Sequence, residues 1–107
     1  MYAMKKVLYR LSASAEIQLQ YLEELGVQGS IDELGLEFDD VWQVLRPLLA
    51  VEDDSVQRCL DILDEAISSD QVVWDEEALR QDVAWRRIRI LAGEALRAME
   101  AYQDPAG

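Results

Sequence analysis

The side chains of this sequence that could take part in chemistry are almost all carboxylates. There is no histidine in the 107 residues, so the commonest general base and metal ligand is missing. The single thiol, Cys59, falls on an apolar helical stripe with no histidine to activate it, and we interpret it as a buried structural residue. The glycines are not spaced as a phosphate-binding loop. Carboxylates are therefore the candidate site residues.

One group of carboxylates has a spacing that suits a metal ion. Glu33, Glu37 and Asp40 follow one another at i, i+4 and i+7, so on a helix they line one flank. Mg²⁺ in proteins is held by one or two carboxylates together with waters and substrate phosphates. Carboxylates on the flank of a helix are also ordinary solvating residues. The sequence leaves both interpretations open.

The same stretch resembles a known family. Residues 37–41, Glu-Phe-Asp-Asp-Val, are similar to the Glu-x-x-Asp helix motif of MazG-like all-α nucleotide pyrophosphohydrolases, and Glu23 and Glu24 resemble part of their first motif. The resemblance implies Mg²⁺ bound by these carboxylates and cleavage of nucleoside triphosphates. It covers only residues 20–45, and residues 25–27 read Leu-Gly-Val where the family has a further acidic residue.

The chain is strongly acidic. Twenty-two acidic and ten basic residues give a net charge of −12, which disfavours direct binding to nucleic acid, because such binding depends on Lys and Arg neutralising phosphates. Residues 11–79 have a net charge of −16, whereas residues 80–97 contain five arginines and have a net charge of +3. This separation permits pairing of the arginine-rich segment with acidic segments, within one chain or between subunits. An acidic surface also attracts basic partners.

Hydrophobic periodicity predicts an all-α, four-helix bundle-like single domain with a long C-terminal helix. The predicted helices span about residues 4–25, 31–50, 55–68 and 75–102. The alternative for the first is an extended piece at residues 6–11 followed by a helix capped at Ser12.

The second predicted helix contains a break or kink. Gly35 is a poor helix former, and Pro47 lacks the N–H that a helix interior requires, so Pro47 is expected to kink or end the helix. A short turn at residues 31–35 followed by a helix at residues 38–46 is the alternative.

The C-terminal helix is the longest of the predicted elements. Asp75 suits its N-cap, and Trp74 and Leu79 have the spacing of a hydrophobic staple. The helix would be roughly 40 Å long, twice the length of the third helix, so part of it would stay uncovered. Val83 and Ile90 lie opposite its apolar face. Burial of these aliphatic side chains predicts a subunit or partner interface.

That interface predicts a homodimer. Val83 and Ile90 would lie in or near the contact, and Arg86, Arg87 and Arg97 beside them would pair with acidic groups of the other subunit.

These observations favour a small, acidic, non-catalytic helical protein that binds another protein, with a basic partner and a regulatory, inhibitor or immunity-like role. No cofactor is expected. No apolar run approaches the ~20 residues of a membrane span, and the N-terminus lacks the pattern of a signal peptide, so a cytoplasmic location is expected. The alternative function is a Mg²⁺-dependent MazG-like hydrolase that uses Glu33, Glu37 and Asp40. An apolar ligand pocket inside the bundle also stays open.

Overall fold

Within residues 2–27, 30–49 and 54–103, which the computed structural model describes, the chain forms six helices and no strand. The helices in chain order are α1 (Tyr2–Ser12), α2 (Ala15–Glu24), α3 (Asp32–Leu49), α4 (Asp54–Ile67), α5 (Glu76–Gln81) and α6 (Val83–Gln103). The all-α prediction is confirmed. Among the described helices, none is both long and apolar enough to span a lipid bilayer.

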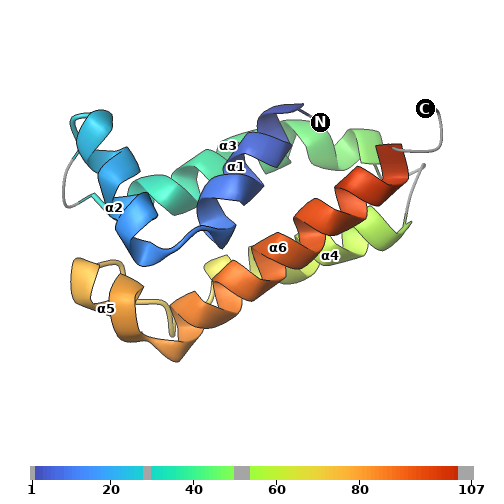
Figure 1. Ribbon diagram of the computed structural model, residues 1–107. Coiled ribbons are helices and arrows are strands. Elements are labelled where there is room, and N and C mark those ends of the chain that lie inside the picture. Colours follow the sequence, from blue (N-terminus) through green and yellow to red (C-terminus); the bar gives the residue numbers. More distant parts are fainter. Residues whose placement is uncertain (1, 28–29, 50–53, 104–107) are drawn as a thin grey trace.

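Four of the helices form a bundle, and the two short ones lie at one end of it. α6 packs against α4 and α1, and α3 packs against both α1 and α4. Neighbours in this ring run in opposite directions (Figure 1). α2 and α5 pack against each other at one end, whereas α1 begins and α6 ends at the other end.

The core is built from the helix faces that the periodicity predicts. Leu63 of α4 and Ile88 of α6 are fully buried, as are Trp85 and, almost completely, Trp42. The third predicted helix matches α4 to within one residue at each end. Cys59 is half-buried on this helix rather than fully buried.

The prediction of one helix over residues 4–25 is wrong, because α1 ends at Ser12 and α2 begins at Ala15. Ser14 has an extended backbone and caps α2, since its hydroxyl accepts a hydrogen bond of 3.3 Å from the N–H of Ile17. The alternative cap at Ser12 is also wrong, because Ser12 donates to the carbonyl of Tyr9 inside α1. Serines bond to nearby backbone in competition with the helix, which favours a break here.

The single long helix over residues 75–102 is also wrong. Asp82 has an extended backbone (ψ 142°) that separates α5 from α6, and its carbonyl accepts the N–H of Arg86 in the first turn of α6. The predicted N-cap is confirmed, since Asp75 accepts a 2.8 Å hydrogen bond from the N–H of Ala78. With 21 residues, α6 is about 31 Å long and lies along both α4 and α1. The part of the C-terminal helix that was predicted to extend uncovered beyond its neighbours is therefore absent from α6.

α3 runs without a break through Gly35 and Pro47, so neither the predicted interruption nor the separate turn at residues 31–35 is present. Pro47 lies in the last turn of the helix. Gly35 is buried beneath Trp74, and a Cβ at this position would lie 2.6 Å from Cη2 of the indole. The glycine allows this close approach. The predicted last residue of the helix, Ala50, lies outside the described residues.

Candidate functional site

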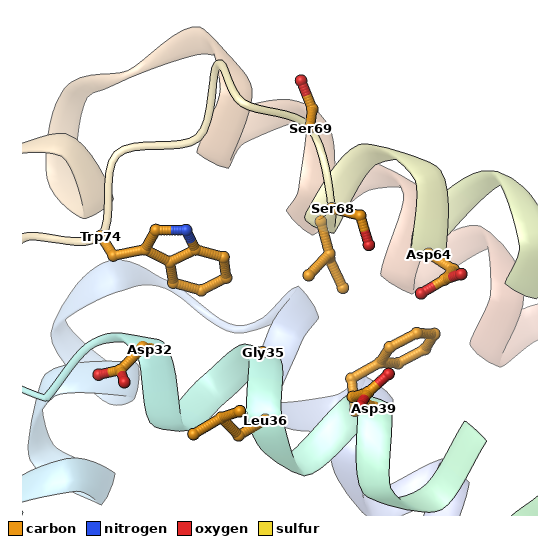
Figure 2. Close-up of a pocket in the computed structure, with 10 residues that line it drawn as sticks. Asp32, Gly35, Leu36, Asp39, Asp64, Ser68, Ser69 and Trp74 are labelled. Carbon is orange, nitrogen blue, oxygen red and sulfur yellow. The ribbon is translucent and has the colours of Figure 1, made fainter. Parts of the chain in front are cut away.

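A hollow of about 350 Å³ lies between the first half of α3 and the end of α4 (Figure 2). Trp74, in the segment that follows α4, forms one wall above Gly35. Phe38 and Ile67 contribute apolar surface. We call this site, which also includes Asp32, Asp39 and Asp64, the acidic hollow.

Trp74 is held in place by a second tryptophan. The ring of Trp85 meets it edge to face, with 5.2 Å between centroids and an interplanar angle of 89°. Trp85 is fully buried, and its indole N–H donates a 2.9 Å hydrogen bond to the carbonyl of Val73. A buried side chain of α6 therefore fixes the backbone and the ring that form the wall of the acidic hollow.

Three carboxylates surround the opening. Asp32 and Asp39 project from α3 and are exposed, whereas Asp64 of α4 is half-buried. None of the three forms an ion pair with another described residue, although Asp39 accepts a 3.3 Å hydrogen bond from Gln43. Burial, and then the negative charge of Asp39, raise the pKa of the Asp64 carboxyl, while Arg46 opposes this shift. A cation that entered the hollow would oppose it further.

These groups together suit one kind of ligand. The face of a tryptophan attracts a cation, and carboxylates accept strong hydrogen bonds from ammonium or guanidinium groups. Apolar surface beside them accommodates the aliphatic stem of Lys or Arg. The acidic hollow therefore has the chemistry to accept a basic side chain.

The predicted Mg²⁺ ligands are not assembled into a site. Glu37 uses one oxygen to accept a 3.1 Å hydrogen bond from Nε of Arg10, and the other to accept the hydroxyl proton of Tyr21. Asp40 is exposed and Glu33 is half-buried on the same helix. Across the described part of the chain, no three Asp, Glu, His or Cys side chains are placed to hold a metal ion together.

Arg10, Tyr21 and Glu37 instead connect α1, α2 and α3. The Arg10 guanidinium lies 4.3 Å from the centroid of the Tyr21 ring. Burial, followed by the hydrogen bond to Glu37, raises the pKa of Tyr21 to about 12. The phenol therefore stays protonated and acts as a hydrogen-bond donor between helices.

Gln18 and Arg89 form a polar pair that the hydrophobic periodicity did not predict. Gln18 is fully buried, and its amide donates hydrogen bonds to the carbonyls of Arg10 (2.9 Å) and Leu11 (3.1 Å). Its side-chain oxygen accepts a 3.2 Å bond from Arg89, which also donates to the carbonyl of Leu79. These carbonyls lie in the last turns of α1 and α5, where helical partners run out, although the Arg10 carbonyl also accepts the N–H of Ala13. Gln18 and Arg89 thus donate hydrogen bonds to backbone carbonyls at both helix breaks. A glutamine at a core spacing, between Ala15 and Leu22, was the available signal.

The predicted interface residues all lie on the solvent-facing side of α6. Val83 is 72% exposed and Ile90 is 56% exposed. No described residue forms an ion pair with Arg86, Arg87 or Arg97. We call this surface the outer face of α6; its exposed residues are Val83, Arg86, Arg87, Ile90, Glu94, Arg97 and Ala101.

The charges are separated by helix. α1 and α6, which pack side by side, contain seven of the ten basic residues and two acidic ones, a net charge of +5. The remaining 75 residues contain three basic and twenty acidic residues, a net charge of −17. One side of the bundle is therefore basic within a strongly acidic molecule.

Comparison of the chain with protein-family models, with curated proteins and with solved structures found no match. The resemblance of residues 37–41 to MazG-like hydrolases therefore rests on that short segment, and the hydrogen bonds of Glu37 do not strengthen it. The acidic hollow and the outer face of α6 are the features from which function can be inferred.

Proposed function

We propose that this chain is a non-catalytic protein-binding protein whose basic partner inserts a Lys or Arg side chain into the acidic hollow. The observation that carries this proposal is the arrangement around Trp74. Asp39 and Asp64 line the same hollow as Trp74, across it from the indole, and neither forms an ion pair with a described residue. A basic side chain of a partner would supply the missing charge.

The physical contributions support such a contact. A cation over a tryptophan face contributes roughly 0.5–2 kcal/mol, depending on how far it is desolvated. Interface hot spots are typically side chains that fill a pocket on the partner, and arginine is among the commonest of them. The net charge of −17 outside α1 and α6 would also speed the encounter with a basic protein.

We further propose that the protein is a homodimer that acts as a regulator or inhibitor by covering the basic surface of its partner. Exposed Val83 and Ile90 on the outer face of α6 support dimerisation, since aliphatic groups gain free energy when a second surface removes them from water. The outer face of α6 would then be covered by the second copy, and the acidic helices would remain available to the partner.

The test is affinity capture with matched variants. The double variant Asp39→Asn with Asp64→Asn alters the acidic hollow, and Glu23→Gln with Glu100→Gln makes the same charge change at exposed positions on α2 and α6. Wild type and the Glu variant should retain a basic protein that the Asp variant loses. With the purified partner, calorimetry should show at least a tenfold weaker Kd for the Asp variant. Equal retention by all three baits, or capture of acidic proteins alone, would reject the proposal.

A further inference from the structure

Exposed positions on the outer face of α6 recur every seven residues, which is the interval at which a helix presents the same side to a neighbouring helix. Two parallel rows follow this interval: Val83, Ile90 and Arg97, and four residues later in each case Arg87, Glu94 and Ala101. All six side chains are exposed. The face therefore has the spacing of a helix–helix contact, with no described helix against it.

The two charges of the second row that flank Ile90 have opposite signs. Arg87 precedes Ile90 by three residues and Glu94 follows it by four. Neither charge has an ion-pair partner among the described residues. If two copies of α6 met in parallel, each Arg87 would face Arg87 and each Glu94 would face Glu94. If they met antiparallel at Ile90, Arg87 of each copy would face Glu94 of the other.

We infer that the occupant of the outer face of α6 is a second copy of this chain, docked antiparallel with the two-fold axis at Ile90. This inference rests on the proposed dimerisation and adds its direction and register. Complementary charge then selects the antiparallel arrangement over the parallel one. The contact is isologous, so each interaction occurs twice.

Two further features fit this register. Gly93 faces Arg86 of the second copy, and its missing side chain leaves room for that arginine; a Cβ there would meet only Arg97 Nη1 at 3.6 Å and Ser12 Cβ at 3.9 Å. Val83 faces Arg97 of the second copy. Beside Val83 is a hollow of about 250 Å³, lined in part by polar side chains of the segment that follows α4, which can receive the arginine stem.

Charge reversal tests the register. Arg87→Glu alone and Glu94→Arg alone each place like charges together, so each variant should associate at least tenfold more weakly than wild type in sedimentation equilibrium. An equimolar mixture should recover the dimer, because both pairs are then complementary. Wild type should sediment at about twice 12.2 kDa. Failure of the mixture to associate, with wild type dimeric, would reject the register but leave dimerisation standing.

Disulfide trapping tests the direction, in a Cys59→Ser background. Ile90→Cys should cross-link the dimer on oxidation, because the two positions meet at the axis. Ala101→Cys should not, because its two copies lie roughly 33 Å apart along an antiparallel pair. Cross-linking at both positions would show a parallel contact, and cross-linking at neither would show a different one. A monomeric wild type would overturn the inference and the dimer together, whereas capture of a basic partner by the acidic hollow is measured independently of both.

Discussion

Gln18 takes part in hydrogen bonds at both helix breaks, directly at the first and through Arg89 at the second. Its amide donates to the carbonyls of Arg10 and Leu11 in the last turn of α1, and its oxygen accepts from Arg89, which reaches the Leu79 carbonyl in α5. Gln18→Leu keeps the volume but removes the amide donor from the Leu11 carbonyl, whereas the Arg10 carbonyl keeps the N–H of Ala13. We therefore expect a loss of roughly 1–3 kcal/mol in the free energy of unfolding, measured with urea. Gln20→Leu, at an exposed position of the same helix, should change it by less than about 0.5 kcal/mol. Equal effects would show that the buried bonds contribute little.

Ionisation of the Tyr21 phenol reports on the contact of Arg10, Tyr21 and Glu37, which connects α1, α2 and α3. Its pKa is raised to about 12 from the ordinary 10.0, so the folded state favours the protonated phenol. The stabilisation is complete below pH 10 and is lost as the pH rises through about 12. An ultraviolet titration should show one phenolate forming near pH 12 that is absent in Tyr21→Phe. In Glu37→Gln this step should move to lower pH, because the opposing carboxylate charge is gone. An unchanged curve would remove Glu37 as a cause.

At the scale of the helices, the approach of α3 to the segment after α4 depends on Gly35. Gly35→Ala brings a methyl group within 2.6 Å of Trp74, whose ring is held by Trp85. Overpacking of this kind costs about 1–3 kcal/mol, which outweighs the gain of up to about 1 kcal/mol in helix propensity. Trp74→Phe should relieve the clash, so a double-mutant cycle followed by thermal melting should show coupling. Additive effects would mean that the two residues do not press on each other.

The helix breaks show where the sequence pattern was insufficient. Only one or two residues leave the helical conformation at each break. The apolar residues of α1 and α2 therefore still fit a single helical period, and so do those of α5 and α6. Ser14, which caps α2, and Asp82, which separates α5 from α6, are both residue types that predict an N-cap. Buried Gln18 and half-buried Arg89, which are 71 positions apart, add hydrogen bonds at both breaks that the local sequence does not predict.

At the scale of the whole molecule, the helical class and the core faces were predictable because they depend on local periodicity. Leu63 and Ile88 are buried for this reason. The acidic hollow was not predictable, because it requires Gly35 and Trp74 to meet across the fold. The sequence showed the positive charge of residues 80–97, but the basic side of the bundle also needs α1 beside α6. Likewise, the spacing of Glu37 suggested a metal ligand, because its hydrogen bonds to Arg10 and Tyr21 depend on the fold and not on the local sequence.

The antiparallel packing of α1 against α6 has a consequence for how the molecule can be tethered. α1 begins and α6 ends at the same end of a body 40 Å long, while the acidic hollow lies toward the opposite end, where α3 begins and α4 ends (Figure 1). A carrier domain, an affinity tag or a solid support joined at either terminus would leave the hollow pointing outward. Neighbouring entry and exit points are also what a host protein needs to hold a bundle as an insertion in one of its loops.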